Sequence, residues 1–347
     1  MPFCLLDLAP IAASFLLAVV LTPVVRALAR RWGVVARPTK ERWHSKPTAL
    51  LGGVALFAGV FPVVLVLCPP IDHGIIIMAG SSVVFAVGLV DDLRRIRPYQ
   101  KLIGQIVAAA IVVLAGLRVT CTGWQFADAL ITAFWLVGIT NAVNLIDNMD
   151  GLAAGVAVIA ALFLAIVFLN EERYAEVGWL GALGGALSGF LVYNAKPASI
   201  FMGDCGALFI GFFLAGLAVL MVSNCPVSFP TMVEIPVLIL IVPIFDTTFV
   251  TIVRTLAGRR ISQGGRDHTS HRLVARGRTE RQAVGVLYGI GLAGGMLAVI
   301  AVSSPSTVHI GLSAGFLLLL VVLGIYLARV PVYATAPSNH GLQFPEA

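Results

Sequence analysis

The segment "NLIDNMDGLAAGVAVIAALFLAIVFLN", residues 144–170, places two aspartates directly before a long apolar run without charges. The run from 152 to 170 has the length of a transmembrane helix, roughly 20 residues. Charge is costly beside hydrocarbon, so ionisable residues such as Asp147 and Asp150 are candidates for function at this position. The segment therefore predicts a membrane protein with a polar site where a span ends.

Composition extends this prediction to the whole chain. Of its 347 residues, 59% are hydrophobic and 12% are charged, whereas soluble domains have about 45–50% apolar and about 25% charged residues. These charges are too few to cover a surface that faces water, so we expect an all-α integral membrane protein. Apolar runs predict about eleven transmembrane helices, at 9–28, 49–68, 74–90, 102–117, 126–143, 152–170, 177–193, 205–224, 232–253, 282–302 and 308–328.

The distribution of Lys and Arg predicts the orientation of these helices. The cations gather in alternate loops, most densely at 29–48, 91–101 and 254–281. Because cytoplasmic loops carry an excess of positive charge, we expect an external N-terminus and a cytoplasmic C-terminus. Residues 1–330 then form a single polytopic membrane domain, and 331–347 a disordered cytoplasmic tail. The net charge of +6 is not carried by a polar folded domain, so we expect no nucleic-acid partner.

Most aspartates are expected at the cytoplasmic ends of the spans. Seven of the ten lie there: Asp91, Asp92, Asp147, Asp150, Asp204, Asp246 and Asp267. Some acids only mark the point where a helix meets water, which accounts for Asp72 and Asp128 on the other side. The acids in "VDDL", "NLIDNMDG" and "FMGDCG" instead abut spans with few neighbouring cations. We therefore expect an active site at the cytoplasmic face.

Four polar residues recur at intervals of three around the opening segment: Asn141, Asn144, Asp147 and Asp150. Each step of three drifts by about 60° in a straight helix, so Asn141 and Asp150 would point in opposite directions. We therefore expect a helix that ends near Asn144 and a loop that continues to Gly151. Oxygen ligands from Asp and Asn suit hard ions, which predicts Mg²⁺, or alternatively Mn²⁺, bound together with phosphates.

A basic segment at residues 259–281 supplies complementary charge. It contains His268 and His271, flanked by Arg266 and Arg272. Arg forks match phosphate oxygens, and His can donate hydrogen bonds to them. The alternative is a loop whose positive charge only sets the topology. We favour a site for a phosphate-bearing substrate.

Several segments in order resemble the polyprenyl-phosphate N-acetylhexosamine-1-phosphate transferases, bacterial membrane enzymes that begin cell-wall and surface glycan assembly. The matching segments are "KPTALLGG" (46–53), "GLVDDLRRIRPYQKLIGQ" (88–105), "NAVNLIDNMDGLAAG" (141–155), "YNAKPASIFMGDCGALFIGF" (193–212), "PIFDT" (243–247) and "RDHTSHRLVARGRTERQ" (266–282). Each motif alone is moderately specific. Their common order on one multi-spanning chain gives the resemblance its weight.

The resemblance implies a reaction and its partners. The phosphate of a polyprenyl lipid, undecaprenyl or decaprenyl phosphate, attacks the sugar-linked phosphorus of a UDP-N-acetylhexosamine. UMP leaves, and a polyprenyl-diphosphate-sugar forms. Such phosphoryl transfer depends on in-line positioning and charge neutralisation. The implied location is the bacterial inner membrane, as a multi-pass protein, and a homodimer is compatible with the resemblance.

The resemblance also implies roles for single residues. Asp91 and Asp92 match the family's paired aspartates, one of which would act as base toward the lipid phosphate or order it. Asn144 and Asp204 match residues associated with Mg²⁺ on the UDP pyrophosphate. Lys101 matches a lysine suited to neutralising phosphate.

The remaining candidates form the walls of the implied site. Asn141 matches the wall beside uridine, and Asp147 and Asp150 match carboxylates of the same wall that we group with the catalytic acids. The basic loop that would hold phosphates or sugar matches at three residues and includes a fourth beside them: Arg266, His268, His271 and Arg272.

Two positions depart from the family pattern. Asn148 stands where a glycine is common, and Ser270 interrupts what is usually a pair of adjacent histidines. The three consecutive histidines of the branch that uses muramoyl-pentapeptide nucleotides are absent, which favours the N-acetylglucosamine branch; the muramoyl branch stays the alternative. A transporter is the alternative from another class, but it would place acids near the midplane and show an internal repeat.

Overall fold

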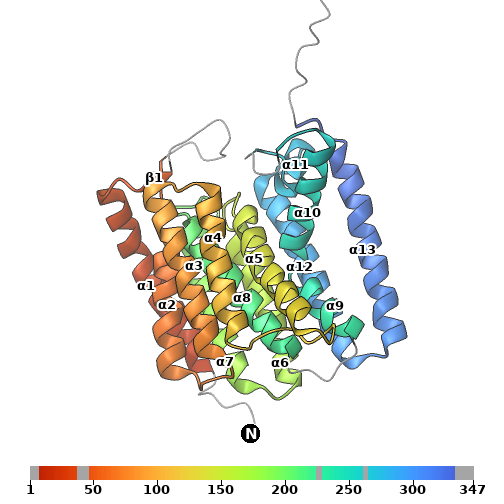
Figure 1. Ribbon diagram of the computed structural model, residues 1–347. Helices are drawn as coiled ribbons and strands as arrows, with labels where there is room; N and C mark the ends of the chain where they lie inside the picture. The colour runs from red at the N-terminus through yellow and green to blue at the C-terminus, as the bar shows by residue number, and fades with distance from the viewer. Residues whose placement is uncertain (1–7, 37–46, 224–228, 261–264, 333–347) are drawn as a thin grey trace, which may run out of the picture.

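The computed structural model describes residues 8–36, 47–223, 229–260 and 265–332. These residues form a helical bundle with one short antiparallel ribbon, so the all-α prediction is confirmed apart from that ribbon (Figure 1). In chain order the elements are α1 (Ala9–Arg31), β1 (Val35–Ala36), β2 (Thr48–Ala49), α2 (Gly52–Leu67), α3 (Gly74–Arg94), α4 (Pro98–Leu114), α5 (Gln125–Ile146), α6 (Leu152–Asn170), α7 (Tyr174–Asn194), α8 (Gly203–Ser223), α9 (Phe229–Ile239), α10 (Ile241–Leu256), α11 (Thr269–Ala275), α12 (Glu280–Ser303) and α13 (Ser306–Ala328). The predicted disordered tail lies, but for its first two residues, outside the described residues.

The predicted spans fall on helices of unequal length. By length and apolar composition, eight helices in the described ranges could cross a membrane, and a ninth crossing results if one bent pair is counted as a single span. Two of the eleven predicted windows fall on the shorter helices α2 and α4, with 16 and 17 residues. The number of eleven spans and their orientation therefore stay predictions.

The bent pair is α9 and α10, whose axes differ by 83°. The sequence predicted one continuous span over 232–253. A straight helix through Leu240 would require a hydrogen bond from the backbone nitrogen of residue 243 to the carbonyl of Ile239. Residue 243 is a proline, which has no N–H to donate, so the chain starts a new helix here. The hydropathy of this segment predicts an apolar helix but does not indicate the break.

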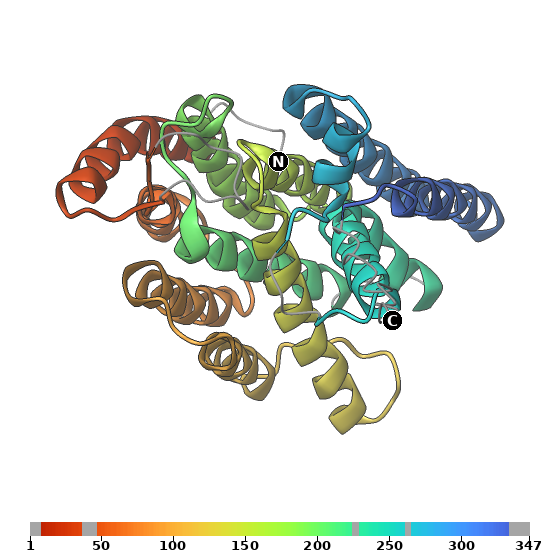
Figure 2. The same cartoon turned by 90° about the horizontal axis from the view of Figure 1, so that it is seen from above.

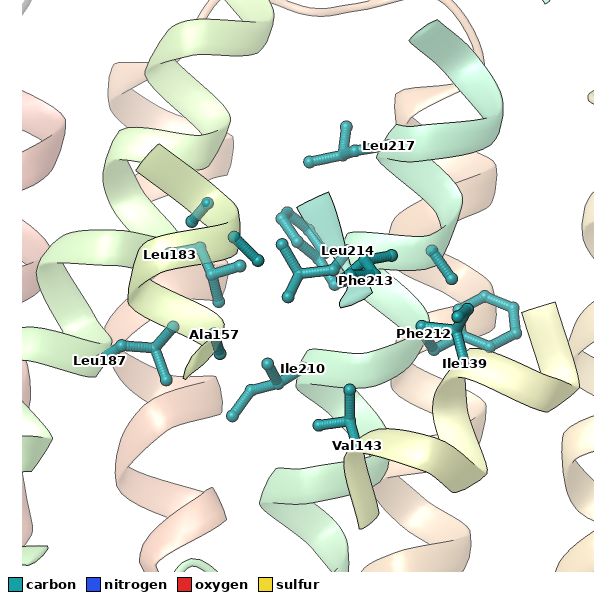
Figure 3. Packing of buried hydrophobic residues seen from close by; sticks show 14 of the residues in the cluster. Ile139, Val143, Ala157, Leu183, Leu187, Ile210, Phe212, Phe213, Leu214 and Leu217 are labelled. Carbon is teal, nitrogen blue, oxygen red and sulfur yellow. The ribbon is translucent and has the colours of Figure 1, made fainter. Parts of the chain in front are cut away.

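Helix α8 forms the centre of the bundle and is enclosed by protein over its whole apolar window. Its neighbours are α2, α3, α5, α6 and α9. Figure 3 shows Ile210 of α8 grouped with Val143 of α5 and Ala157 of α6. Because lipid is as apolar as these side chains, close packing holds such a helix more than exclusion of water does.

Four helix ends meet at one end of the bundle, where Figure 1 shows β1 and α11. Helices α3 and α5 finish there and α8 begins there, since Asp92 and Asn144 both reach Asp204. Helix α11 is tied to the same place through Ser270 and Asn148. Figure 2 views the bundle from this end, with α12 and α13 on the side opposite α1 and α2. The fold thereby collects the polar residues that the sequence separates.

Candidate active site

A cavity of about 550 Å³ lies among these helix ends. Its volume is in the range of small-molecule sites, about 300–1,000 Å³. Apolar walls include Leu50 and Phe201. The polar lining comes from α3, the α5–α6 turn, α8 and α11 and consists of Asp91, Asp92, Arg95, Asp147, Asn148, Asp150, Asp204, His268 and His271. Seven of these were predicted from sequence as site residues, and the fold brings them together.

A lysine joins two of the carboxylates. Lys101 Nζ, near the start of α4, donates to Asp91 Oδ2 at 3.1 Å and also to the carboxylate of Asp204. Asn144 Nδ2 donates to Asp204 Oδ1 at 2.9 Å. Lys101 and Asn144 thus belong to the site through Asp204, although they contribute no surface to the cavity lining. The result is a cation held between two carboxylates, with an amide fixing one of them.

The second aspartate of the pair has a different environment. Asp92 Oδ1 accepts the backbone N–H of Asp204 at 2.9 Å, and Asp92 Oδ2 accepts that of Cys205 at 3.0 Å. The first N–H groups of a helix lack partners within it, so this carboxylate caps α8 from a neighbouring helix. Gly203 permits the approach, because a Cβ there would lie 2.6 Å from Asp92 Oδ2. Gly88, one turn before Asp92 in α3, also permits close packing of α3 against α8, because a Cβ there would lie 2.6 Å from the Asp204 carbonyl oxygen.

The turn between α5 and α6 carries the next two candidate acids. Helix α5 ends at Ile146, close to the end predicted at Asn144. Asp150 Oδ2 accepts the backbone N–H of Ala198 at 3.0 Å, which ties the turn to the loop before α8. Asp147 and Asp150 both line the cavity. This agrees with the predicted loop that brings several oxygens to one site.

Asp246 of α10 holds the start of α11. Its Oδ2 lies 2.7 Å from His268 Nδ1, and its Oδ1 accepts the backbone N–H of Thr269 at 2.7 Å. Asp246 and His268 are both buried. When neutral, His268 therefore carries its proton on Nδ1 and presents Nε2 as an acceptor.

His271 lies one helical turn after His268, with the ring centroids 5.7 Å apart. Burial, together with the nearby charges of His268 and Arg266, lowers the pKa of His271 from 6.5 to about 4. His271 is therefore a neutral imidazole at pH 7. It can form hydrogen bonds to a substrate there, but it does not supply positive charge. Arg266 lies outside the cavity lining, and its charge still acts on His271.

Two predicted substrate-binding residues are placed away from the cavity lining. Asn141 exchanges two hydrogen bonds with the buried Gln105, at 2.6 and 3.1 Å. Arg272 is 1% exposed and donates to the carbonyls of Asp267, Leu327 and Val330. Asn141 thus joins α5 to α4, and Arg272 joins α11 to the end of α13. The sequence showed both as polar residues in the right segment but not the direction of their side chains.

Several contributing residues were not assigned a role from sequence. Asp246 and Asp267 were noted only as acids at helix ends, yet Asp246 orients His268 and Asp267 forms a buried pair with Arg254 at 2.7 Å. In the sequence, Asp246 could have been noticed as a carboxylate among apolar residues, and Asp267 as a carboxylate beside an arginine. Gln105 had the weaker signal of an amide within an apolar helix.

Comparisons with known proteins show the family to which the sequence is similar. Residues 74–222 match the sequence model of glycosyl transferase family 4. The probable undecaprenyl-phosphate N-acetylglucosaminyl 1-phosphate transferase of Bacillus subtilis is 34% identical over 319 residues, covering 88% of this chain and 87% of that protein. The decaprenyl-phosphate N-acetylglucosaminephosphotransferase of Mycolicibacterium smegmatis is 30% identical over 356 residues, with 91% and 86% covered.

A relative from another branch is also similar. The phospho-N-acetylmuramoyl-pentapeptide-transferase of Lactobacillus johnsonii is 34% identical over 243 residues, covering 61% of this chain and 75% of that protein. The helices and these similarities define a bacterial multi-pass membrane protein. The chain belongs to glycosyl transferase family 4.

Proposed function

We propose that this protein transfers N-acetylglucosamine 1-phosphate from UDP-N-acetylglucosamine to a polyprenyl phosphate at the cytoplasmic face of the membrane. An oxygen of the lipid phosphate forms a bond to the sugar-linked phosphorus, the bond from that phosphorus to UMP breaks, and UMP leaves. The observation that carries the proposal is the cluster of Asp91, Lys101, Asn144 and Asp204 at one end of a membrane bundle. The names of the two N-acetylglucosamine-phosphate transferases above give the substrate class.

The donor set of this cluster suits Mg²⁺. In the described ranges no three His, Cys, Asp or Glu side chains are grouped to hold a metal ion by themselves. Mg²⁺ does not need such a cage, because it binds through one or two carboxylates, waters and substrate phosphates. Asp91 and Asp204 already share one cationic group, the Lys101 ammonium, so the pair is built to hold positive charge between them. Asp204 and Asn144 would hold the ion, with Asp91 beside them.

The bound ion would neutralise charge on the pyrophosphate of the donor. The residues of this chain then divide the remaining work. Asn144 fixes the rotamer of Asp204, and Asp92 fixes its backbone through the start of α8. Lys101, paired with Asp91 and Asp204, would offset the negative charge that these carboxylates present to an incoming phosphate. Positioning and charge compensation of this kind make up most of the catalysis in phosphoryl transfer.

The opposite wall offers hydrogen-bonding groups to the donor. His268 presents Nε2 because Asp246 occupies its Nδ1, and His271 is neutral at pH 7. We assign His268 Nε2, an acceptor in the neutral ring, to a hydroxyl of the sugar, and the neutral His271 to a hydrogen bond with the donor substrate. Asp147 and Asp150 line the same cavity.

A transfer assay with purified protein in detergent tests this function. Radiolabelled UDP-N-acetylglucosamine, undecaprenyl phosphate and Mg²⁺ should yield a labelled lipid and UMP, whereas the Asp204→Asn variant should yield neither. Turnover of UDP-N-acetylmuramoyl-pentapeptide in place of UDP-N-acetylglucosamine would assign the chain to the branch of the Lactobacillus relative. Uptake of nucleotide sugar into vesicles without lipid product would identify a transporter.

A further inference from the structure

Ser270 and Asn148 connect two walls of the cavity. Ser270 Oγ, on α11, donates to Asn148 Oδ1, in the turn between α5 and α6, at 2.7 Å. Ser270 is 1% exposed, so its hydroxyl is shielded from competing water. The Asn148 side chain is fixed from its other end, because Nδ2 donates to the Leu145 carbonyl at 3.0 Å. The bond therefore joins two ordered groups that lie 122 residues apart.

The other contacts of α11 described above run away from that turn. Asp246 of α10 holds His268 and Thr269, and Arg272 is bonded to the end of α13. Helix α11 thereby belongs to the α10–α13 part of the bundle. The Ser270–Asn148 bond ties that part to the turn that bears Asp147 and Asp150.

We propose that Ser270 and Asn148 form a positioning bridge that sets the reach of His268 and His271 across the cavity to the nucleotide sugar. Ser270 lies between the two histidines in sequence, so a shift of α11 at this point moves both imidazoles. Both bridge positions are ones at which this chain differs from the family pattern noted above. A glycine at 148 has no side-chain acceptor, so the bridge could not form with that residue. The inference rests on the proposed function for its substrate but not for the existence of the bridge.

The kinetic test uses Ser270→Ala, Asn148→Ala and the double variant, with Ser188→Ala as matched control. Ser188 Oγ also donates to one oxygen, the Gly184 carbonyl at 2.7 Å, but within α7 and away from the cavity. Loss of one shielded hydrogen bond should raise the KM for UDP-N-acetylglucosamine by about fivefold in Ser270→Ala. The value of kcat and the KM for undecaprenyl phosphate should change by less than about twofold, because the contact exists in the bound ground state.

The double variant separates a bridge from two independent effects. If the two side chains act on each other, Ser270→Ala should add nothing to KM in the Asn148→Ala background. Additive increases, or an unchanged KM in Ser270→Ala, would overturn the proposal. A fall in kcat that follows the fall in thermal stability would also overturn it, since the pair would then only hold the fold.

Hydrogen exchange tests the bridge without any activity. Ser270→Ala and Asn148→Ala should each speed amide exchange in residues 269–275, and the double variant should match the faster single variant. Unchanged exchange in both single variants would refute the bridge itself. If exchange behaves as expected but the native protein makes no lipid product from any UDP-sugar, the proposed function fails while the bridge remains.

Discussion

Asp92 caps a helix that is distant in the chain: its Oδ1 accepts the backbone N–H of Asp204, 112 residues later, at 2.9 Å. The carboxylate also accepts the next N–H, from Cys205, and so compensates the positive end of the α8 dipole. Asp204 is the residue that we assign to Mg²⁺. One member of the aspartate pair therefore determines where the proposed metal ligand stands, and the other, Asp91, shares Lys101 with it.

Replacing Asp92 should impair both folding and turnover. Asp92→Ala leaves two helix-terminal N–H groups without their acceptor and should lower the free energy of unfolding by about 1–2 kcal/mol. Asp92→Asn keeps one acceptor oxygen, so its free energy of unfolding should lie between those of Asp92→Ala and the native protein. Thermal unfolding in detergent and the transfer assay should rank the three proteins in the same order. Asp72→Asn, an exposed acid outside the cavity lining, serves as control. Native stability in Asp92→Ala would contradict the capping role.

Removal of the proposed metal ligand should act on chemistry with little effect on folding. Asp204→Asn should reduce turnover at least about 100-fold, the scale of losing one preorganised charge contact. It should also weaken Mn²⁺ binding in the presence of UDP-sugar, measured by electron paramagnetic resonance. Near-native turnover at millimolar Mg²⁺ would show that Asp204 does not hold the metal.

The lowered pKa of His271 predicts a dependence of stability on pH. The pKa is about 4 in the folded protein and about 6.5 in the unfolded chain, so the unfolded chain binds the proton first. The stabilising contribution is complete above about pH 6.5 and is lost as the pH falls toward 4. Between pH 7.5 and 4, the melting temperature of the native protein should therefore fall more steeply than that of His271→Asn. Parallel curves for the two proteins would contradict the burial of a neutral imidazole.

Arg272 should matter for stability more than for substrate affinity. Its guanidinium is buried and bonded to backbone carbonyls of α13, and a glutamine cannot reach them all. Arg272→Gln should lower the free energy of unfolding by about 3 kcal/mol, because charged donors to buried acceptors are lost. In the protein that remains folded, KM for the UDP-sugar should stay near native. An increased KM at native stability would support the substrate-binding role predicted from sequence.

The predicted topology is tested by reporters. The clustering of cations at 29–48, 91–101 and 254–281 predicts an external N-terminus and a cytoplasmic C-terminus, with eleven spans between them. A C-terminal fluorescent protein that folds only in the cytoplasm should therefore be bright, and alkaline phosphatase at the same position should be inactive. The opposite pattern would require an even number of spans or an inverted protein.

Much of the fold followed from hydropathy, because an apolar run long enough to cross a membrane also forms a helix. The helices over 152–170 and 177–193 were predicted on that basis and are present as α6 and α7. The break at Leu240 was missed, since the residues directly on both sides of it are apolar. Pro243 was the available signal.

The candidate site was predicted as a set of residues but not as a set of contacts. Polar groups beside spans are conspicuous in sequence, which is why Asp91, Asp204 and His268 could be singled out. Which partner each one meets depends on helices distant in the chain: Lys101 and Asp204 are 103 residues apart, and Asn148 and Ser270 are 122 apart. No local pattern distinguishes a capping aspartate such as Asp92 from one that faces substrate.

The enclosed position of α8 has a consequence for biosynthesis. Four of its neighbours, α2, α3, α5 and α6, precede it in the chain, so a ribosome delivers their sequences first; α9, which also contacts it, follows. Helix α8 is thus synthesised after most of the helices that surround it in the folded protein. The apolar sequence that lets α8 leave the insertion machinery has no lipid to face once assembly is complete. The effect of a substitution in α8 should therefore depend more on how well the new side chain packs against the neighbouring helices than on its hydropathy.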